Sequence, residues 1–99
     1  MAKYAVIYTT LSVEASNRVR PQHIEFLKDM IGKGRVVDGM KFPDYYDGCI
    51  QGVLIAEGGS KQEVAEWFRK DPVITSGART FEVREYDRGM VGQEVGKSQ

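Results

Sequence analysis

Two segments of the chain carry apolar side chains at consecutive positions, and this pattern restricts the possible folds more than any other feature. Residues 3–9 and 49–56 are rich in β-branched and aromatic residues, which is typical of strands. In each segment the apolar side chains occupy both faces of the strand. A sheet built on such strands has to be covered on both sides.

A helix is predicted between these two strands. It is expected to begin near Pro21, because a proline in the first turn of a helix has no hydrogen bond to lose. Glycine is a common stop signal, so the helix is expected to end at Gly32 or Gly34.

The remaining elements follow from local signals. Residues 35–42 and 80–86 are predicted to be strands, and the one-sided alternation of the second suits an edge of the sheet. A second helix is predicted to begin at the capping box Ser60–Glu63. It is expected to end at Asp71–Pro72, since the residue before a proline is disfavoured in the helical region.

The predicted order is strand, helix, strand, strand, helix, strand. This is the α+β arrangement called ferredoxin-like, βαββαβ, in which a four-stranded antiparallel sheet carries two helices on one face. We expect a single domain over residues 1–86. Residues 87–99 show no periodicity and are expected to form a C-terminal tail that is flexible or packs on a partner subunit.

Two helices cover only one face of the sheet, so the other face needs a partner. We therefore expect a homodimer through the open sheet face, with further assembly left open. Lys plus Arg equals Asp plus Glu at 14 each, and this balance argues against nucleic acid or a membrane surface as a partner. The single cysteine, Cys49, and the lack of a long apolar run lead us to expect a cytoplasmic protein.

The only histidine of the chain, His23, falls on the apolar side of the first predicted helix. At about 100° per residue, Leu27 lies near 40° from it, Met30 near −20° and Phe26 near −60°. The imidazole is therefore predicted to point toward the sheet.

Asp71 is predicted to point inward from the second helix, near −20° from Val64 if the last turn stays helical. Both helices pack on the same side of the sheet, so the two side chains could meet as a hydrogen-bonded pair. The aspartate would then fix the imidazole tautomer, and the histidine would serve as a general acid or base. A structural interpretation also stands, in which His23 belongs to the core and Asp71 only caps the segment after Pro72.

The sequence gives no reason to expect a cofactor or a metal ion. Cys49 has no second cysteine beside it and His23 has no second histidine, so a zinc site from this chain alone is not expected. We expect instead a small-molecule ligand.

Four segments in this order resemble the YCII-related family: Arg20–Leu27, Gly34–Gly39, Ala65–Trp67 and Asp71–Gly77. The resemblance covers residues 3–86. It implies a dimeric ferredoxin-like α/β barrel with a histidine–aspartate pair as its candidate acid–base catalyst. That pair corresponds to His23 and Asp71 here.

The family includes an enzyme that removes chloride from a chlorinated hydroxyquinol, while many members have no assigned reaction. The substrate therefore does not transfer to this chain. Family members commonly carry Gly-Pro where this chain has Gly39-Met40, and its hairpin 43–48 is compact, so the shape of the pocket mouth does not transfer either.

Two functions remain open at this stage. The first is a small enzyme that moves a proton on a small cyclic or phenolic metabolite, in a lyase, isomerase or hydrolase type of step, with His23 and Asp71 as its catalytic pair. Residues expected to bind the substrate are Tyr8 and Arg20, through an oxygen of it, and Gly39 and Gly77, through close backbone approach. The alternative is a non-catalytic ligand-binding or accessory module of the dimeric α/β barrel class, in which the pair only stabilises the fold and the dimer. Other dimeric barrels, such as the muconolactone isomerase and small monooxygenase groups, have the same architecture but match these motifs less well.

Overall fold

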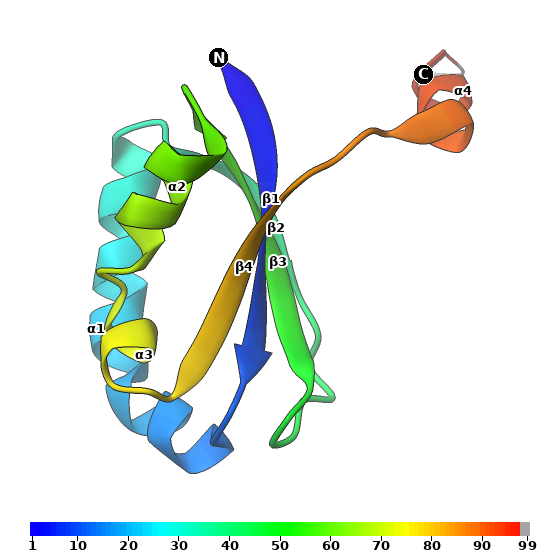
Figure 1. Ribbon diagram of the computed structural model, residues 1–99. Coiled ribbons are helices and arrows are strands. Elements are labelled where there is room, and N and C mark those ends of the chain that lie inside the picture. Colours follow the sequence, from blue (N-terminus) through cyan, green and yellow to red (C-terminus); the bar gives the residue numbers. More distant parts are fainter. Residues whose placement is uncertain (98–99) are drawn as a thin grey trace.

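The strands and helices follow one another along the chain in the predicted order, and two further helices are added (Figure 1). The computed structural model describes residues 1–97. The elements are β1 (Ala2–Thr10), α1 (Val13–Gly32), β2 (Val36–Lys41), β3 (Ile50–Gly58), α2 (Lys61–Phe68), α3 (Pro72–Thr75), β4 (Arg79–Glu85) and α4 (Gly89–Lys97). Each strand begins and ends within two residues of its predicted bounds.

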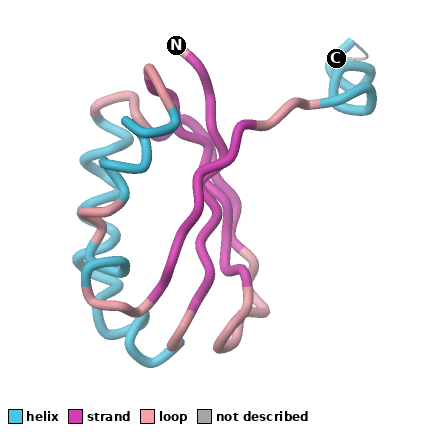
Figure 2. Tube along the Cα trace, viewed as in Figure 1, coloured by secondary structure: helices cyan, strands magenta, loops and turns pink. Residues whose placement is uncertain are grey.

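The four strands form one antiparallel sheet in the order β2-β3-β1-β4. β4 lies at an edge, as its one-sided pattern predicted. Figures 1 and 2 show α1, α2 and α3 together on one face of the sheet, and no helix of the described chain on the other face. The predicted ferredoxin-like α+β fold is confirmed. No helix within residues 1–97 is long and apolar enough to cross a membrane.

The core lies between the sheet and the helices. Tyr4, Val6 and Tyr8 alternate along β1 toward the helices and are buried, together with Val64 and Phe68 of α2. The intervening side chains of β1 point to the open face of the sheet, because successive residues of a strand face opposite sides. The apolar character of both faces, which the sequence indicated, is therefore real.

The first helix begins eight residues earlier than predicted. Ser12 is its N-cap and its side chain accepts a hydrogen bond from the Ala15 N–H at 3.1 Å, so Val13 starts the helix. Ala15 and Val19 pack against the core at helical spacing, which stabilises the additional turns. Pro21 consequently lies inside the helix, and its use as a start signal was wrong.

The second helix also ends earlier than predicted. α2 stops at Phe68, and Asp71 is the N-cap of the short helix α3, with Pro72 in its first turn. Both proline effects act here, because Pro72 restricts the residue before it and is suited to start a helix. Ser60 caps α2 as predicted, because its side chain accepts from the Glu63 N–H at 3.1 Å. The Glu63 carboxylate accepts from the N–H of Gly59 at 3.3 Å rather than from that of Ser60, so one of the two hydrogen bonds of the predicted capping box is present.

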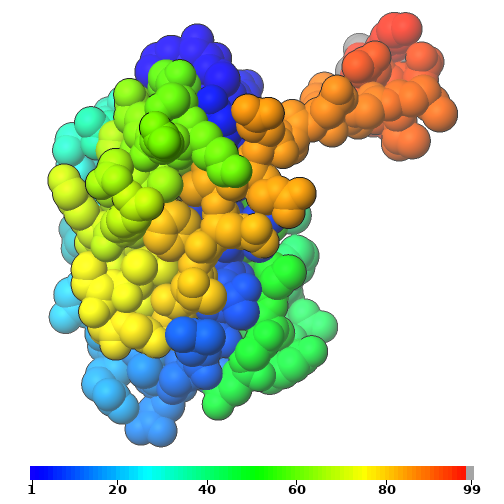
Figure 3. Space-filling model, viewed as in Figure 1, coloured from blue at the N-terminus to red at the C-terminus, as the bar shows by residue number. Residues whose placement is uncertain are grey.

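The segment after β4 contains a helix that the sequence analysis did not predict. α4 has no buried residue, and Figures 1 and 3 show it projecting away from the sheet. Its three glycines lowered the expectation of a helix, because glycine disfavours helix interiors. Packing of this tail on a partner stays a prediction, and residues 98–99 of the tail lie outside the described residues.

The position of Pro21 inside α1 leads to a stability prediction. Proline cannot donate the helical hydrogen bond to the carbonyl of Asn17, so Pro21→Ala is expected to raise the free energy of unfolding by about 1–3 kcal/mol. Urea unfolding followed by circular dichroism measures this difference. Gln22→Ala, at the neighbouring exposed position, is the control and should change the free energy by a few tenths of a kcal/mol. An unchanged or lower stability of Pro21→Ala would contradict the prediction.

Candidate functional site

The histidine and the aspartate singled out by the sequence are in direct contact. The Nδ1 atom of His23 lies 2.8 Å from Oδ1 and 2.9 Å from Oδ2 of Asp71. Both side chains are buried, at 6% and 0% exposure. His23 reaches this position from the inward side of α1, and Asp71 reaches it from the N-cap of α3 rather than from the end of α2.

Two further groups satisfy the Asp71 carboxylate. The Tyr8 hydroxyl donates to Oδ2 at 2.6 Å, and the Val73 N–H donates to Oδ1 at 3.1 Å. Asp71 therefore caps α3 and contacts His23 at the same time. The structure contains both the pair and the cap that the sequence offered as alternatives. Burial, and after it the charge and hydrogen bond of Asp71, raise the pKa of the Tyr8 hydroxyl well above its ordinary value. Tyr8 thus acts as a neutral donor.

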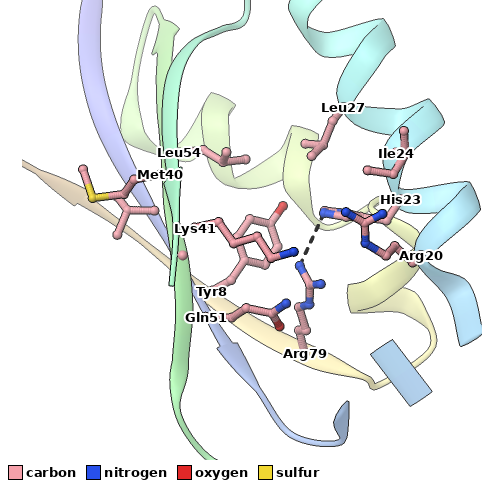
Figure 4. A pocket seen from close by; sticks show the side chains of 12 residues that line it. Tyr8, Arg20, His23, Ile24, Leu27, Met40, Lys41, Gln51, Leu54 and Arg79 are labelled. Atoms are coloured by element: carbon pink, nitrogen blue, oxygen red, sulfur yellow. Dashed lines mark hydrogen bonds between the residues drawn. The ribbon is translucent and has the colours of Figure 1, made fainter. Parts of the chain in front are cut away.

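The second ring nitrogen of His23 faces an arginine (Figure 4). Nη1 of Arg79 lies 3.3 Å from Nε2, and Nε of Arg79 donates to Oγ of Ser16 at 2.9 Å. A guanidinium can only donate, so Nε2 has to be the acceptor in this contact. His23 is consequently a neutral imidazole with its proton on Nδ1, donated to Asp71. Burial lowers the pKa of Arg79, while Tyr8 and Asp71 act against this shift.

A pocket of about 150 Å³ lies over these groups. Ile24, Leu27 and Leu54 form an apolar wall, and Figure 4 shows them on one side of the pocket. The polar part of the lining consists of Tyr8, Arg20, His23, Lys41, Gln51 and Arg79. An apolar wall facing a few convergent polar groups is the usual make-up of a small-molecule site.

The charges around the pocket have one sign. Arg20, Lys41 and Arg79 line it, and no carboxylate of the described residues does. The chain as a whole is neutral, so this cationic lining is a local feature. It suits a ligand that carries an anionic or strongly polarised oxygen and an apolar body.

The predicted site residues fall into two groups. His23, Tyr8 and Arg20 line the pocket, and Asp71 lies behind His23. The two glycines expected to allow close approach of the ligand do not line it. Gly39 lies in β2 beside Leu54, and Gly77 follows α3 with φ 79°, a conformation that a turn requires.

The donor set does not suit a metal ion. Within residues 1–97 no group of three or more His, Cys, Asp and Glu side chains could hold one. His23 and Asp71 also use their donor atoms on each other.

Comparison with known protein families assigns the chain to one of them. The sequence model of the YCII-related domain matches residues 2–87. The chain belongs to the YCII-related family. The predicted resemblance is thereby confirmed over the whole sheet and the helices that cover it.

A solved structure that is similar to this YCII-related chain supports the fold. It is 5-chloro-2-hydroxyhydroquinone dehydrochlorinase from Burkholderia phenoliruptrix AC1100, solved in complex with 2,5-dihydroxybenzoquinone. The match has a TM-score of 0.65 and 19% sequence identity, and it covers 87% of this chain and 95% of the other. The comparison with curated proteins gave no match. At this identity the likeness concerns the fold.

Three polar residues of the pocket were not predicted from the sequence: Lys41, Gln51 and Arg79. Arg79 had a signal, because it shares the inward parity of Phe81 and Val83 in β4. Lys41 had no signal, because a register shift between Val36 and Asp38 changes which residues of β2 face the helices. Gln51 had no signal, since a β-bulge places it: Tyr8 pairs with Gly52 and the next residue pairs with Ile50.

Gln51 is thus the extra residue of the bulge, and Thr10 donates to its side-chain oxygen. A bulge that turns a polar side chain toward a pocket is a recurring device next to functional sites.

The raised pKa of Tyr8 gives a pH-dependent prediction for this YCII-related chain. Tyr8→Phe removes the hydroxyl that donates to Asp71 and is expected to lower the free energy of unfolding by about 1–3 kcal/mol at neutral pH. Above about pH 10 the unfolded wild type loses the Tyr8 proton while the folded state keeps it, so wild-type stability falls there.

The difference in the free energy of unfolding between the wild type and Tyr8→Phe should therefore become smaller as the pH rises above about 10. Urea unfolding at a series of pH values measures it. A difference that stays constant or widens would show that the Tyr8 proton is not held by the folded state.

Proposed function

We propose that this protein is a small acid–base enzyme in which His23, oriented by Asp71, moves a proton on a cyclic or phenolic metabolite. The observation that carries the proposal is the buried pair at 2.8 Å whose second nitrogen, Nε2, faces a pocket lined by cations. A titratable group with a specific charged partner at the wall of a pocket is a candidate catalytic group.

The geometry assigns a role to each member of the pair. Because Nδ1–H donates to Asp71, the tautomer of His23 directs its lone pair at Nε2 toward the pocket. An imidazole that takes a proton at Nε2 becomes a cation, and the adjacent carboxylate stabilises it. Tyr8 and the Val73 N–H hold that carboxylate in place.

The size and lining of the pocket support a single-ring substrate. A cavity of about this volume lined by aliphatic and aromatic side chains holds benzene. Arg20, Lys41 and Arg79 would bind ring oxygens, and the leucine and isoleucine wall would contact the ring. The structural neighbour acts on a chlorinated hydroxyhydroquinone, as its name states, and this supports a phenolic substrate. A lyase, isomerase or hydrolase type of step is compatible with this arrangement.

One observation favours the alternative, a non-catalytic ligand-binding module. Nε2 of His23 already accepts a hydrogen bond from Arg79, so the lone pair that a base needs is occupied. The pair would then stabilise the fold around a pocket that only binds.

We also propose that the chain forms a homodimer through the open sheet face. Ile7, Val53 and Ile55 lie on that face and are partly exposed in the single chain. Neighbouring apolar side chains that stay partly exposed on an uncovered sheet face are typical of an interaction surface. α4 carries the exposed side chains Met90 and Val91 and would extend this contact to the partner.

The catalytic proposal predicts the effect of two substitutions. Chlorinated and unchlorinated di- and trihydroxybenzenes serve as candidate substrates, with chloride release and quinone absorbance as the measurements. For a substrate that is turned over, His23→Gln and Asp71→Asn should each lower kcat by about 10²–10⁴-fold, since general acid–base catalysis contributes that much. Glu25→Gln, an exposed carboxylate-to-amide change on α1, should leave kcat unchanged.

Turnover that survives His23→Gln would contradict the mechanism. Nitrogen-15 NMR of the imidazole provides a check without a substrate. If the ring resonances and the titration curve of His23 are the same in Asp71→Asn as in the wild type, the two residues do not interact. The proposal that Asp71 orients His23 as a base is then wrong.

The dimer proposal predicts a change of mass. Ile55→Glu is expected to convert a dimer into a folded monomer, because burying an unpaired carboxylate in an apolar interface costs several kcal/mol. Sedimentation velocity measures the mass, and circular dichroism checks the fold. Ile31→Glu, the same change at an exposed position of α1, should leave the mass unchanged. A wild type that stays monomeric at all concentrations would contradict the proposal.

A further inference from the structure

Arg79 is a buried cation whose contacts are neutral. It is 8% exposed, and its hydrogen-bond partners are the Ser16 hydroxyl and Nε2 of His23. Its guanidinium carbon also lies 5.7 Å from the centre of the Tyr8 ring. None of the ion pairs among residues 1–97 involves Arg79. A buried guanidinium of this kind has donor capacity and charge to spare for an anion.

The carboxylate whose charge acts on Arg79, that of Asp71, lies on the other side of the imidazole. Asp71 binds Nδ1 of His23, whereas Arg79 binds Nε2, so the ring separates the two charges. Arg20 and Lys41 also line the pocket, but both are exposed residues, and Arg79 is the buried cation of the three. An anionic oxygen that enters the pocket would therefore find its strongest desolvated partner at Arg79.

The contact between Arg79 and His23 is well suited to be exchanged. Its donor–acceptor distance of 3.3 Å is longer than the usual N···O distance of about 2.9–3.0 Å in an N–H···O hydrogen bond, and its acceptor is neutral. A hydrogen bond from a guanidinium to a charged oxygen is about twice as strong as one to a neutral acceptor. An anion within reach of Nη1 would therefore compete successfully with Nε2.

We propose that Arg79 binds the anionic oxygen, a phenolate or a carboxylate, of a single-ring ligand, and that its movement from Nε2 of His23 to this oxygen uncovers the nitrogen. The inference rests on the proposed function only in calling Nε2 a base, since anion binding by Arg79 is independent of turnover. A ring without an anionic oxygen would contact the apolar wall and leave Nε2 covered. The protein would thereby select ionised ligands.

Two matched probes test the inference on the unmodified protein. 4-Nitrophenol, used at a pH at which it is ionised, carries an anionic oxygen, and 4-nitroanisole is a neutral ring of similar shape. The phenolate is expected to bind and to shift the nitrogen-15 resonance of Nε2 of His23. The anisole should bind at least about tenfold more weakly, the loss of one charge-assisted hydrogen bond, and should leave that resonance unchanged.

Variants assign the effect to Arg79. Arg79→Met keeps the aliphatic chain and removes every donor, so it should weaken phenolate binding at least about tenfold and remove the preference over the anisole. In the free variant, the Nε2 resonance should already differ from that of the free wild type. Arg79→Lys keeps the charge and should retain part of the binding. Arg18→Gln, an exposed arginine on α1, is the control and should change nothing.

Equal binding of the two probes, or phenolate binding that leaves Nε2 unchanged, would overturn the inference. So would phenolate binding that Arg79→Met does not weaken, even if His23→Gln abolishes turnover and the catalytic proposal stands. Conversely, if the phenolate binds through Arg79 and shifts Nε2 while no substrate is turned over, the inference holds for a ligand-binding module and the catalytic proposal fails.

Discussion

The carboxylate of Asp71 is fully buried, and the polar geometry of the site depends on how its charge is satisfied. It accepts hydrogen bonds from Tyr8 on β1, from His23 on α1 and from the Val73 N–H in α3. A buried carboxylate without such partners costs several kcal/mol, so the ion is stable only when a strand and two helices meet around it. The pair therefore contributes to holding the helical layer on the sheet as well as to the chemistry of the pocket.

The sheet could be predicted because β1 and β3 are rich in β-branched and aromatic residues and β4 alternates on one side, which are patterns of a central and of an edge strand. The first helix was harder to place, since the sequence offers two competing start signals. Ser12 provides a side-chain cap and Pro21 a suitable first-turn residue, and the first prevails because Ala15 and Val19 bury apolar surface in the extra turns. The hydrogen bond that Pro21 cannot donate contributes less to the free energy than this burial does. Tertiary packing outweighs the local signal here.

The site was predictable where side-chain direction follows from periodicity. His23 and Tyr8 point inward because helix and strand periods place them there, and the same rule applied to β4 would have found Arg79. Asp71 points inward for a different reason from the one predicted, since it caps α3 instead of ending α2. Gln51 could not be predicted, because a bulge shifts the register that the rule assumes.

The order of the charged groups in the site links ligand binding at Arg79 to the protonation of His23. Anionic Asp71, neutral His23 and cationic Arg79 succeed one another, and the cation lines the pocket. A proton taken up at Nε2 would place a second positive charge beside Arg79, and at about 4 Å two such charges repel by roughly 4 kcal/mol in a protein-like dielectric. Asp71 stabilises the protonated ring from the Nδ1 side, but no carboxylate among the described lining residues faces Arg79. An anionic ligand on Arg79 would offset this repulsion, so the molecule that uncovers Nε2 would also favour its protonation. A neutral ligand would do neither.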